Sequence, residues 1–227
     1  MIKDLFSQVK DQIETARKTA VGSADMTKLV AVSKQQPDDK ITDALATGHR
    51  LFGENRVQEA TMRWQARKNE FTDLTLHLIG PLQSNKVSDA VALFDVIETI
   101  DRPKIAVALA KEMAKQDKYL PCFIQVNTGD EPQKSGISPQ ETLSFVNHCQ
   151  SELGLNIIGL MCIPPQSEEP AMHFALLKKL AKQAGLPHLS MGMSADFEQA
   201  IAFGADYVRV GSALFGERLP RINNDDA

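Results

Sequence analysis

The apolar run Lys28-Leu29-Val30-Ala31-Val32-Ser33-Lys34 is followed at once by the polar segment Gln35-Gln36-Pro37-Asp38-Asp39. A short, continuous apolar run that stops at a turn signal is typical of a buried strand. We therefore expect a strand over 28–34, with the amine of Lys34 at its carboxyl end. A lysine that is desolvated at such a rim can lose its proton and capture a carbonyl, although many strands simply end in a solvated lysine.

Strand-like and helix-like segments alternate along the whole chain. The predicted strands are 28–34, 50–54, 74–80, 95–100, 120–127, 155–163, 188–193 and 207–211. The predicted helices between them are 37–48, 55–70, 84–94, 103–117, 138–153, 168–183 and 195–204. This alternation predicts an α/β fold with a parallel sheet, and eight strands are the number that closes a (β/α)8 barrel of the TIM type. The alternative is an open doubly wound sheet, but no Gly-rich dinucleotide turn follows the first strand.

The chain of 227 residues is expected to form one domain over 1–227. An extra amphipathic helix is predicted over 1–20, where it would cover the bottom of the barrel, and a frayed tail over 220–227. A net charge of −4 gives no support to nucleic-acid binding. No apolar stretch approaches the length of a membrane span, and the three cysteines lack metal-type spacing. We therefore expect a cytoplasmic protein with reduced thiols.

Two turns late in the chain have the composition of an anion site. Met191-Gly192-Met193-Ser194-Ala195-Asp196 follows the seventh predicted strand, and Val210-Gly211-Ser212-Ala213 follows the eighth. Each combines a glycine, which lets the backbone approach a ligand, with a serine near a helix start, where backbone N–H groups attract anions. Either turn alone is compatible with an ordinary helix cap. Barrels commonly bind phosphate after strands 7 and 8, so the two turns together favour a phosphate site.

Arg209 and His77 are polar side chains within largely apolar predicted strands. Arg209 is flanked by valines in the eighth strand, and a buried guanidinium is costly unless its hydrogen bonds are accepted. Arg209 would therefore either form an ion pair with a neighbouring strand or reach a ligand atom. His77 in the third strand is expected to be a hydrogen-bonded barrel residue rather than a catalytic base.

A closed barrel places its last strand beside its first, so Lys34, Arg209 and the two serine turns would share one arc of one face. An amine that can form an imine, a phosphate seat and a cation between them predict a pocket for pyridoxal 5′-phosphate. In this arrangement the aldehyde would link to Lys34, and Arg209 would meet the pyridine nitrogen.

Seven ordered motifs are distributed along nearly the whole chain. They are Ala31-Val32-Ser33-Lys34, Gly53-Glu54-Asn55, His77-Leu78-Ile79-Gly80-Pro81-Leu82-Gln83-Ser84-Asn85-Lys86, Lys134-Ser135-Gly136, Gly159-Leu160-Met161, Gly192-Met193-Ser194-Ala195-Asp196 and Arg209-Val210-Gly211-Ser212-Ala213-Leu214-Phe215-Gly216. With these motifs the chain resembles the pyridoxal phosphate homeostasis proteins, whose barrel is similar to the N-terminal domain of alanine racemase.

The resemblance implies a Schiff base between the cofactor and Lys34. It also implies cofactor contacts from six further residues: Asn55, Met193, Ser194, Arg209, Gly211 and Ser212. Arg56 departs from the pattern, because many members carry an aromatic residue after Gly-Glu-Asn. The side-chain contacts near Asn55 are therefore left open.

Three functions compete at this point. The first is a carrier that buffers pyridoxal phosphate or delivers it to apoenzymes without turnover. The second is an amino-acid racemase, but the resemblance implies that such enzymes add a second domain with a tyrosine base, whereas Tyr119 and Tyr207 precede or begin strands here. An arginine at the pyridine nitrogen also makes the ring a poorer electron sink. The third is a cofactor-free Schiff-base aldolase. We favour the carrier, as a monomer because the second domain is missing.

Overall fold

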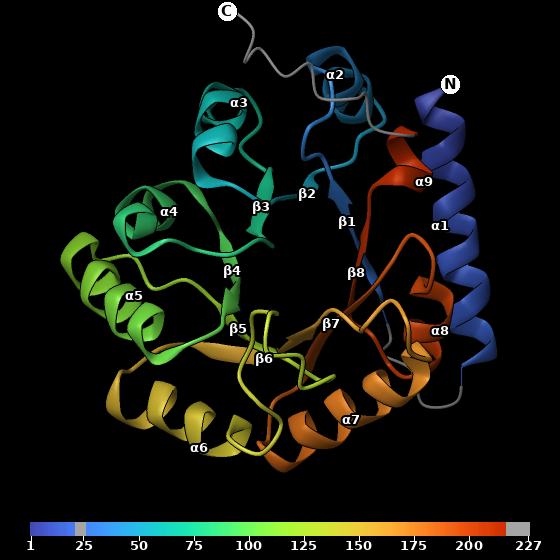
Figure 1. The fold of residues 1–227 in the computed structure, drawn as a ribbon. Helices are drawn as coiled ribbons and strands as arrows, with labels where there is room; N and C mark the ends of the chain where they lie inside the picture. Colours follow the sequence, from blue (N-terminus) through green and yellow to red (C-terminus); the bar gives the residue numbers. More distant parts are fainter. Residues whose placement is uncertain (21–25, 217–227) are drawn as a thin grey trace, which may run out of the picture.

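The computed structural model describes residues 1–20 and 26–216. Its centre is a closed barrel of eight parallel strands in chain order, so that the last strand pairs with the first (Figure 1). The strands are β1 (Lys28–Val32), β2 (Leu51–Glu54), β3 (Thr75–Leu78), β4 (Val96–Ile100), β5 (Cys122–Val126), β6 (Ile157–Cys162), β7 (His188–Met193) and β8 (Tyr207–Val210). The (β/α)8 prediction is confirmed, and the open doubly wound sheet is excluded.

Helices connect the strands on the outside of the barrel and form the ring seen in Figure 1. They are α2 (Asp38–Ala46), α3 (Val57–Glu70), the 3₁₀ turn η1 (Ser84–Lys86) leading into α4 (Val87–Leu93), α5 (Pro103–Gln116), α6 (Thr142–Asn147) continued by the π-helical turn η2 (His148–Glu152), α7 (Pro170–Gln183), α8 (Phe197–Ala202) and the short α9 (Ser212–Phe215). The predicted crossover helices all have a counterpart, with shifted ends.

The start of α6 differs from the prediction. The segment 138–141 was expected to open the helix, but it forms a separate turn and α6 begins at Thr142. The Ser138 hydroxyl donates to Glu141 Oε2 at 2.6 Å and accepts from the Glu141 backbone N–H at 3.3 Å. These bonds close a turn that leads directly into α6, so the helix begins four residues later than predicted.

The N-terminal helix α1 (Ile2–Thr19) does not cover the bottom of the barrel, so that expectation was wrong. It packs on the outside against α2, α8 and α9 (Figure 1). Its buried stripe includes Phe6, Val9 and Ile13. The reason is that α9 spans only 4 residues, which leaves the outer side of β8 and β1 to be covered by another helix. The tail 220–227, predicted to be frayed, lies outside the described residues.

Two apolar cores lie on the two sides of the strands. The larger one packs the helices against the outer side of the barrel. A smaller cluster joins Val30, Val96, Phe123, Met161 and Tyr207 from five different strands. These inward-facing side chains fill the barrel, which is therefore a packed core and not a pore.

His49 links α1 to the start of β2. Its ring lies 5.2 Å from the ring of Phe6 and 5.2 Å from that of Phe52, and Nε2 bonds to the carbonyl of Leu51 at 2.7 Å. Burial disfavours the imidazolium and lowers the pKa of His49 to about 4.

This depressed pKa predicts a pH-dependent stability. As the pH falls below the unfolded-state pKa, the unfolded chain takes up a proton at His49 that the folded chain refuses. The free energy of unfolding should therefore fall by about 2 kcal/mol between roughly pH 7 and pH 5 on account of this group. Urea unfolding of the wild type and of His49→Gln at both pH values checks this. The variant should lose less stability on acidification, and equal losses would contradict the assignment.

Candidate functional site

Lys34 lies on a turn beyond the end of β1. The strand ends at Val32, and the Ser33 N–H still donates to the Gly53 carbonyl at 3.2 Å. The chain then reverses, and the Gln36 N–H donates to the Ser33 carbonyl at 3.1 Å. Gln35 has a φ of +59°, in the left-handed region, which no strand can contain. The prediction of a strand to residue 34 was therefore too long, and half-buried Lys34 extends from the turn at the carboxyl end of the barrel.

The turns after β7 and β8 are joined directly. The Gly211 N–H donates to the Ser194 hydroxyl at 3.2 Å. The pairing of β8 with β1 then brings this pair of turns beside the Lys34 turn, since Ala31 is in register with Val210. A Cβ atom on Gly211 would lie in ordinary van der Waals contact with Val32, 3.4 Å from its Cβ, so the β8 turn packs directly on the end of β1. Five predicted site residues on β7, β8 and the turns after them thus gather next to β1: Met193, Ser194, Arg209, Gly211 and Ser212.

The two turns differ in how well they suit an anion. At the β7 turn, the Met193 N–H donates to Asp196 Oδ1 at 2.6 Å, so a carboxylate is already present there. At the β8 turn, α9 begins at Ser212, and the first N–H groups of a helix have no carbonyl partner within it. The β8 turn, with Gly211 and Ser212, is therefore the more suitable of the two for an anion, and its role as a phosphate site stays a prediction.

Arg209 is buried, with 4% of its surface exposed. Its Nη1 donates to the Ser190 hydroxyl at 2.6 Å and lies 4.0 Å from Glu98 Oε2, and its Nη2 donates to the Cys162 carbonyl at 2.8 Å. The guanidinium therefore bridges β4, β6 and β7. Arg209 therefore has the partners on neighbouring strands that the first of the two alternatives predicted. Its contact with a pyridine nitrogen stays a prediction.

Glu98 connects Arg209 to His77 inside the barrel. His77 Nδ1 lies 2.5 Å from Glu98 Oε1, and the Ser190 hydroxyl donates to Glu98 Oε2 at 2.6 Å. Burial alone would raise the pKa of Glu98, but the hydrogen bond and charge of His77, with smaller contributions from Arg209 and Ser190, hold it below its usual range. The prediction that His77 is a hydrogen-bonded barrel residue is confirmed.

Asn55 lies at the end of β2, beside β1, and lines a cavity of about 330 Å³ at the barrel mouth. Its Oδ1 is buried and has no hydrogen-bond partner among the described residues. A Cβ atom on Gly80 would lie 2.3 Å from the Asn55 carbonyl oxygen, so only glycine permits this packing. An orphaned acceptor at a cavity wall fits a ligand that donates a hydrogen bond.

Other polar residues at the barrel mouth were not predicted from the sequence. Gln125 and Asn127 line the same cavity as Asn55, together with Lys134. Gln125 could have been noticed, because a single polar residue in the apolar strand Cys122–Val126 is the same signal that identified Arg209. Lys34, Arg209 and the serine turns do not line this cavity, so the predicted residues form an arc over β7, β8, β1 and β2 with Asn55 at its end.

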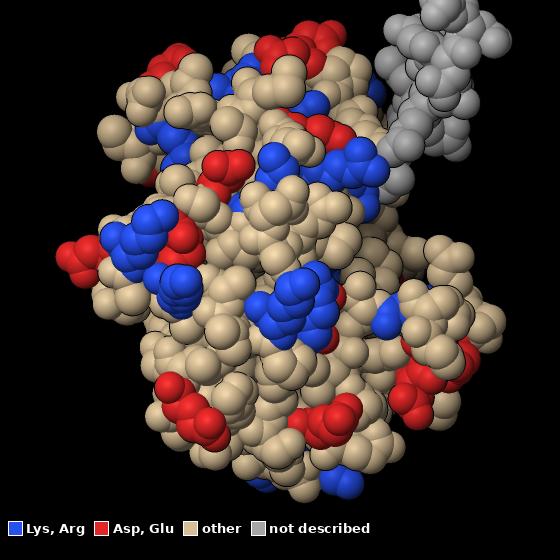
Figure 2. Space-filling model, turned by 60° about the vertical axis from the view of Figure 1, so that its left-hand side comes forward, with Lys and Arg blue, Asp and Glu red and all other residues tan. Residues whose placement is uncertain are grey.

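Charged groups of both signs are mixed on one face of the molecule. On the face shown in Figure 2, groups of Lys and Arg alternate with acidic groups and neutral surface. Among the described residues, no helix is long and apolar enough to cross a bilayer. In the same part of the chain, no three His, Cys, Asp or Glu side chains are grouped so as to hold a metal ion.

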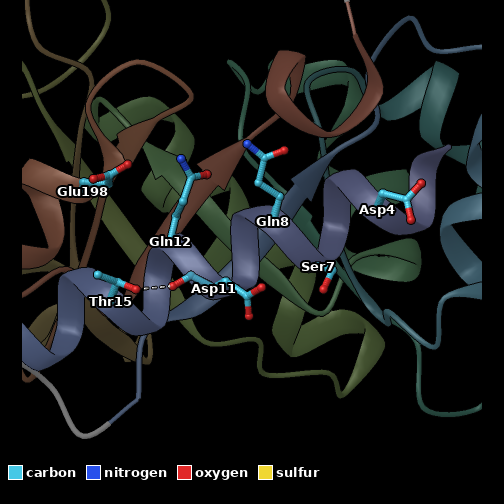
Figure 3. Close-up of a pocket in the computed structure, with 7 residues that line it drawn as sticks. All are labelled: Asp4, Ser7, Gln8, Asp11, Gln12, Thr15 and Glu198. Atoms are coloured by element: carbon cyan, nitrogen blue, oxygen red, sulfur yellow. Dashed lines mark hydrogen bonds between the residues drawn. The ribbon is translucent and has the colours of Figure 1, made fainter.

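A separate hollow of about 620 Å³ lies between α1 and α8 (Figure 3). Asp4, Asp11 and Glu198 contribute carboxylates to it, and the Thr15 hydroxyl donates to the Asp11 carbonyl at 2.8 Å. Its acidic lining is unsuited to a phosphate, and none of the predicted site residues lines it.

The profile of the family described as "Alanine racemase, N-terminal domain" matches residues 6–219, which defines the class of this barrel. The pyridoxal phosphate homeostasis protein of Haemophilus influenzae is 37% identical, with 96% of each chain covered. That of Escherichia coli (strain K12) is 39% identical, with 94% of this chain and 95% of the relative covered. The chain belongs to the pyridoxal phosphate homeostasis protein family.

Solved structures agree with this assignment. PipY of Synechococcus elongatus PCC7942 with PLP bound is 33% identical at a TM-score of 0.80, covering 95% of this chain and 100% of PipY. An alanine racemase of Clostridium difficile 630 is 15% identical at a TM-score of 0.71. That second match covers 97% of this chain and 58% of the racemase, and it shows the fold alone.

The buried contacts of Glu98 predict how its substitution changes the free energy of unfolding. Glu98→Gln removes the carboxylate that balances Arg209 and His77, and breaking a buried pair on one side typically costs about 3–5 kcal/mol. Urea unfolding should show this loss in the variant. Glu112→Gln is the matched control, because Glu112 bonds to Ser88, Lys115 and Gln116 at the surface of α5, and it should change stability little. Equal effects of the two substitutions would contradict the interior network.

Proposed function

We propose that this chain binds pyridoxal 5′-phosphate reversibly at the carboxyl end of the barrel, holds it as a Schiff base on Lys34, and buffers or delivers it inside the cell. The observation that carries the proposal is the β1–β8 pairing, which sets the Lys34 turn beside the joined Ser194 and Gly211 turns. Membership of the homeostasis family and the PLP in the PipY structure support it.

The residues of the arc suit the parts of this cofactor. Ser194, Gly211 and Ser212 would hold the phosphate through hydroxyl and backbone N–H groups. Asn55 offers an unused acceptor to a donor on the ring. Arg209 would direct its cation toward the pyridine nitrogen, and Met193 would contact the ring.

Of the protein, the covalent step needs only the amine of Lys34; water is released when the imine forms and consumed when it breaks. When bound, pyridoxal phosphate supplies an aldehyde; the neutral amine adds to its carbon, one water leaves and a C=N bond forms. Addition of water reverses the step and returns both the amine and the aldehyde. A linkage that forms and breaks with water alone suits storage and release.

The placement of the tyrosines supports binding without turnover. Tyr207 is the first residue of β8, and its ring packs against His77, Phe123 and His188. Tyr119 is 61% exposed and precedes β5. Both therefore belong to the amino-terminal end of the barrel, opposite Lys34. Arg209 at a pyridine nitrogen would also keep that nitrogen unprotonated and weaken carbanion chemistry.

We also propose a cytoplasmic location and delivery to pyridoxal phosphate-dependent apoenzymes. Cys122, Cys149 and Cys162 are buried free thiols. Burial raises the pKa of Cys162 to about 12, which makes it an inert packing residue.

Purified protein given pyridoxal phosphate should show the visible absorbance of an imine and turn yellow. Lys34→Ala should lose this absorbance because it removes the amine. Lys86→Ala should keep it, since Lys86 lies in the η1 turn after β3. Neither the wild type nor either variant should racemise free amino acids measurably. Absence of the imine in the wild type would overturn the proposal, and racemisation abolished by Lys34→Ala would replace the carrier with an enzyme.

A further inference from the structure

We infer that Glu54 and Arg63 are positioning residues for Lys34, because together they lock the turn that carries it. The inference rests on the proposed function, since it concerns how Lys34 meets the aldehyde. Neither side chain belongs to the predicted cofactor contacts. Glu54 binds the side chain of Ser33, and Arg63 binds the backbone carbonyls of Ser33 and Gln36 on either side of Lys34.

Glu54 is the last residue of β2 and is fully buried. A single oxygen, Oε1, accepts three hydrogen bonds: from the Ser33 hydroxyl at 2.7 Å, from Arg63 Nη1 at 2.7 Å and from Trp64 Nε1 at 3.0 Å. A carboxylate is expensive to bury, and these donors with the guanidinium charge offset part of that cost, while Oε2 has no hydrogen-bond partner among the described residues. The residue before Lys34 is thus tied to β2 and α3.

Arg63 holds both ends of the turn at once. From α3, its Nη1 donates to the Ser33 carbonyl at 3.1 Å, and its Nη2 donates to the Gln36 carbonyl at 3.1 Å. Its side chain is only 16% exposed. The planar fork of an arginine can bridge two carbonyls in this way, whereas a lysine presents one point of charge.

Lys34 and Gln35 are the two residues between these clamped ends. Gln35 holds a left-handed φ of +59°, which is unfavourable for a residue with a side chain and persists only where its surroundings impose it. Release of the clamp would let the turn relax and spread the Lys34 amine over many positions. Fewer of those positions would be in reach of the aldehyde, so imine formation should slow.

The test separates positioning from folding by using two ligands. Pyridoxal phosphate forms the imine, whereas pyridoxine 5′-phosphate has the same ring and phosphate but no aldehyde, so it reports non-covalent binding alone. The test variant is Arg63→Lys, which keeps the charge beside Glu54 but loses the fork. Ser33→Ala is a milder second variant, which removes one donor to Glu54 and leaves the ion pair in place.

Arg50→Lys is the matched control. Arg50 also bridges two carbonyls, those of Leu45 and His49, and pairs with Asp73 at 3.0 Å. It directly precedes β2, at the opposite end of the barrel from Lys34. The control therefore removes a similar set of bonds without touching the Lys34 turn.

Arg63→Lys should slow imine formation by about fivefold or more, the factor that corresponds to losing one ordinary hydrogen bond. Its affinity for pyridoxine 5′-phosphate should equal that of the wild type, and Ser33→Ala should show a smaller slowing. Arg50→Lys should change neither quantity. Stopped-flow absorbance gives the rate, and calorimetry gives the affinity.

Wild-type imine rates in both clamp variants would overturn the inference. An equal loss of imine rate and of pyridoxine 5′-phosphate affinity would also overturn it, because that result shows general damage to the pocket. A wild-type protein that binds pyridoxine 5′-phosphate but forms no imine at Lys34 would overturn the proposed Schiff base, and this inference with it.

Discussion

The parallel pairing of β1 with β8 closes the barrel, and closure decides which strand ends become neighbours. A closed sheet leaves no edge strand to protect, and all eight carboxyl ends open on one face. In chain order, the ends of β1 and β8 are separated by most of the sequence. In space they adjoin, so the turn after β8 and the turn with Lys34 form one surface. The candidate site is a consequence of that contact.

Closure also forces the barrel to accommodate its inward-facing polar side chains. Arg209, Glu98, Ser190 and His77 satisfy one another across four strands, above the apolar cluster that includes Tyr207. A guanidinium held by a carboxylate, a hydroxyl and a carbonyl is restricted in where it can point. The same network that satisfies these buried groups would therefore determine how Arg209 meets the ring of the proposed cofactor. On the outer side of the barrel, Glu54 and Arg63 restrict the Lys34 turn in a similar way, through their bonds to Ser33 and Gln36.

The sequence was sufficient for the fold because the strands are largely buried and appear as mainly apolar runs, of which Leu29–Val32 is an unbroken example. Local signals were less reliable at the ends of helices. Before α6, for example, the bond between Ser138 and Glu141 closes a turn where the first helical turn had been predicted. The position of α1 depended on the shortness of α9, which no local pattern reports. The pairing of Glu54 with Ser33 spans two strands, and it could be recognised only once the barrel had placed β2 beside β1.

The central claim is that Lys34 anchors pyridoxal phosphate through a reversible C=N bond. Reduction by borohydride makes that bond permanent, and peptide mapping by mass spectrometry then identifies the modified lysine. The account predicts one pyridoxyl group on the peptide that contains Lys34 and none after the protein has been treated with hydroxylamine before reduction. Modification spread over surface lysines, with the Lys34 peptide unlabelled, would contradict it.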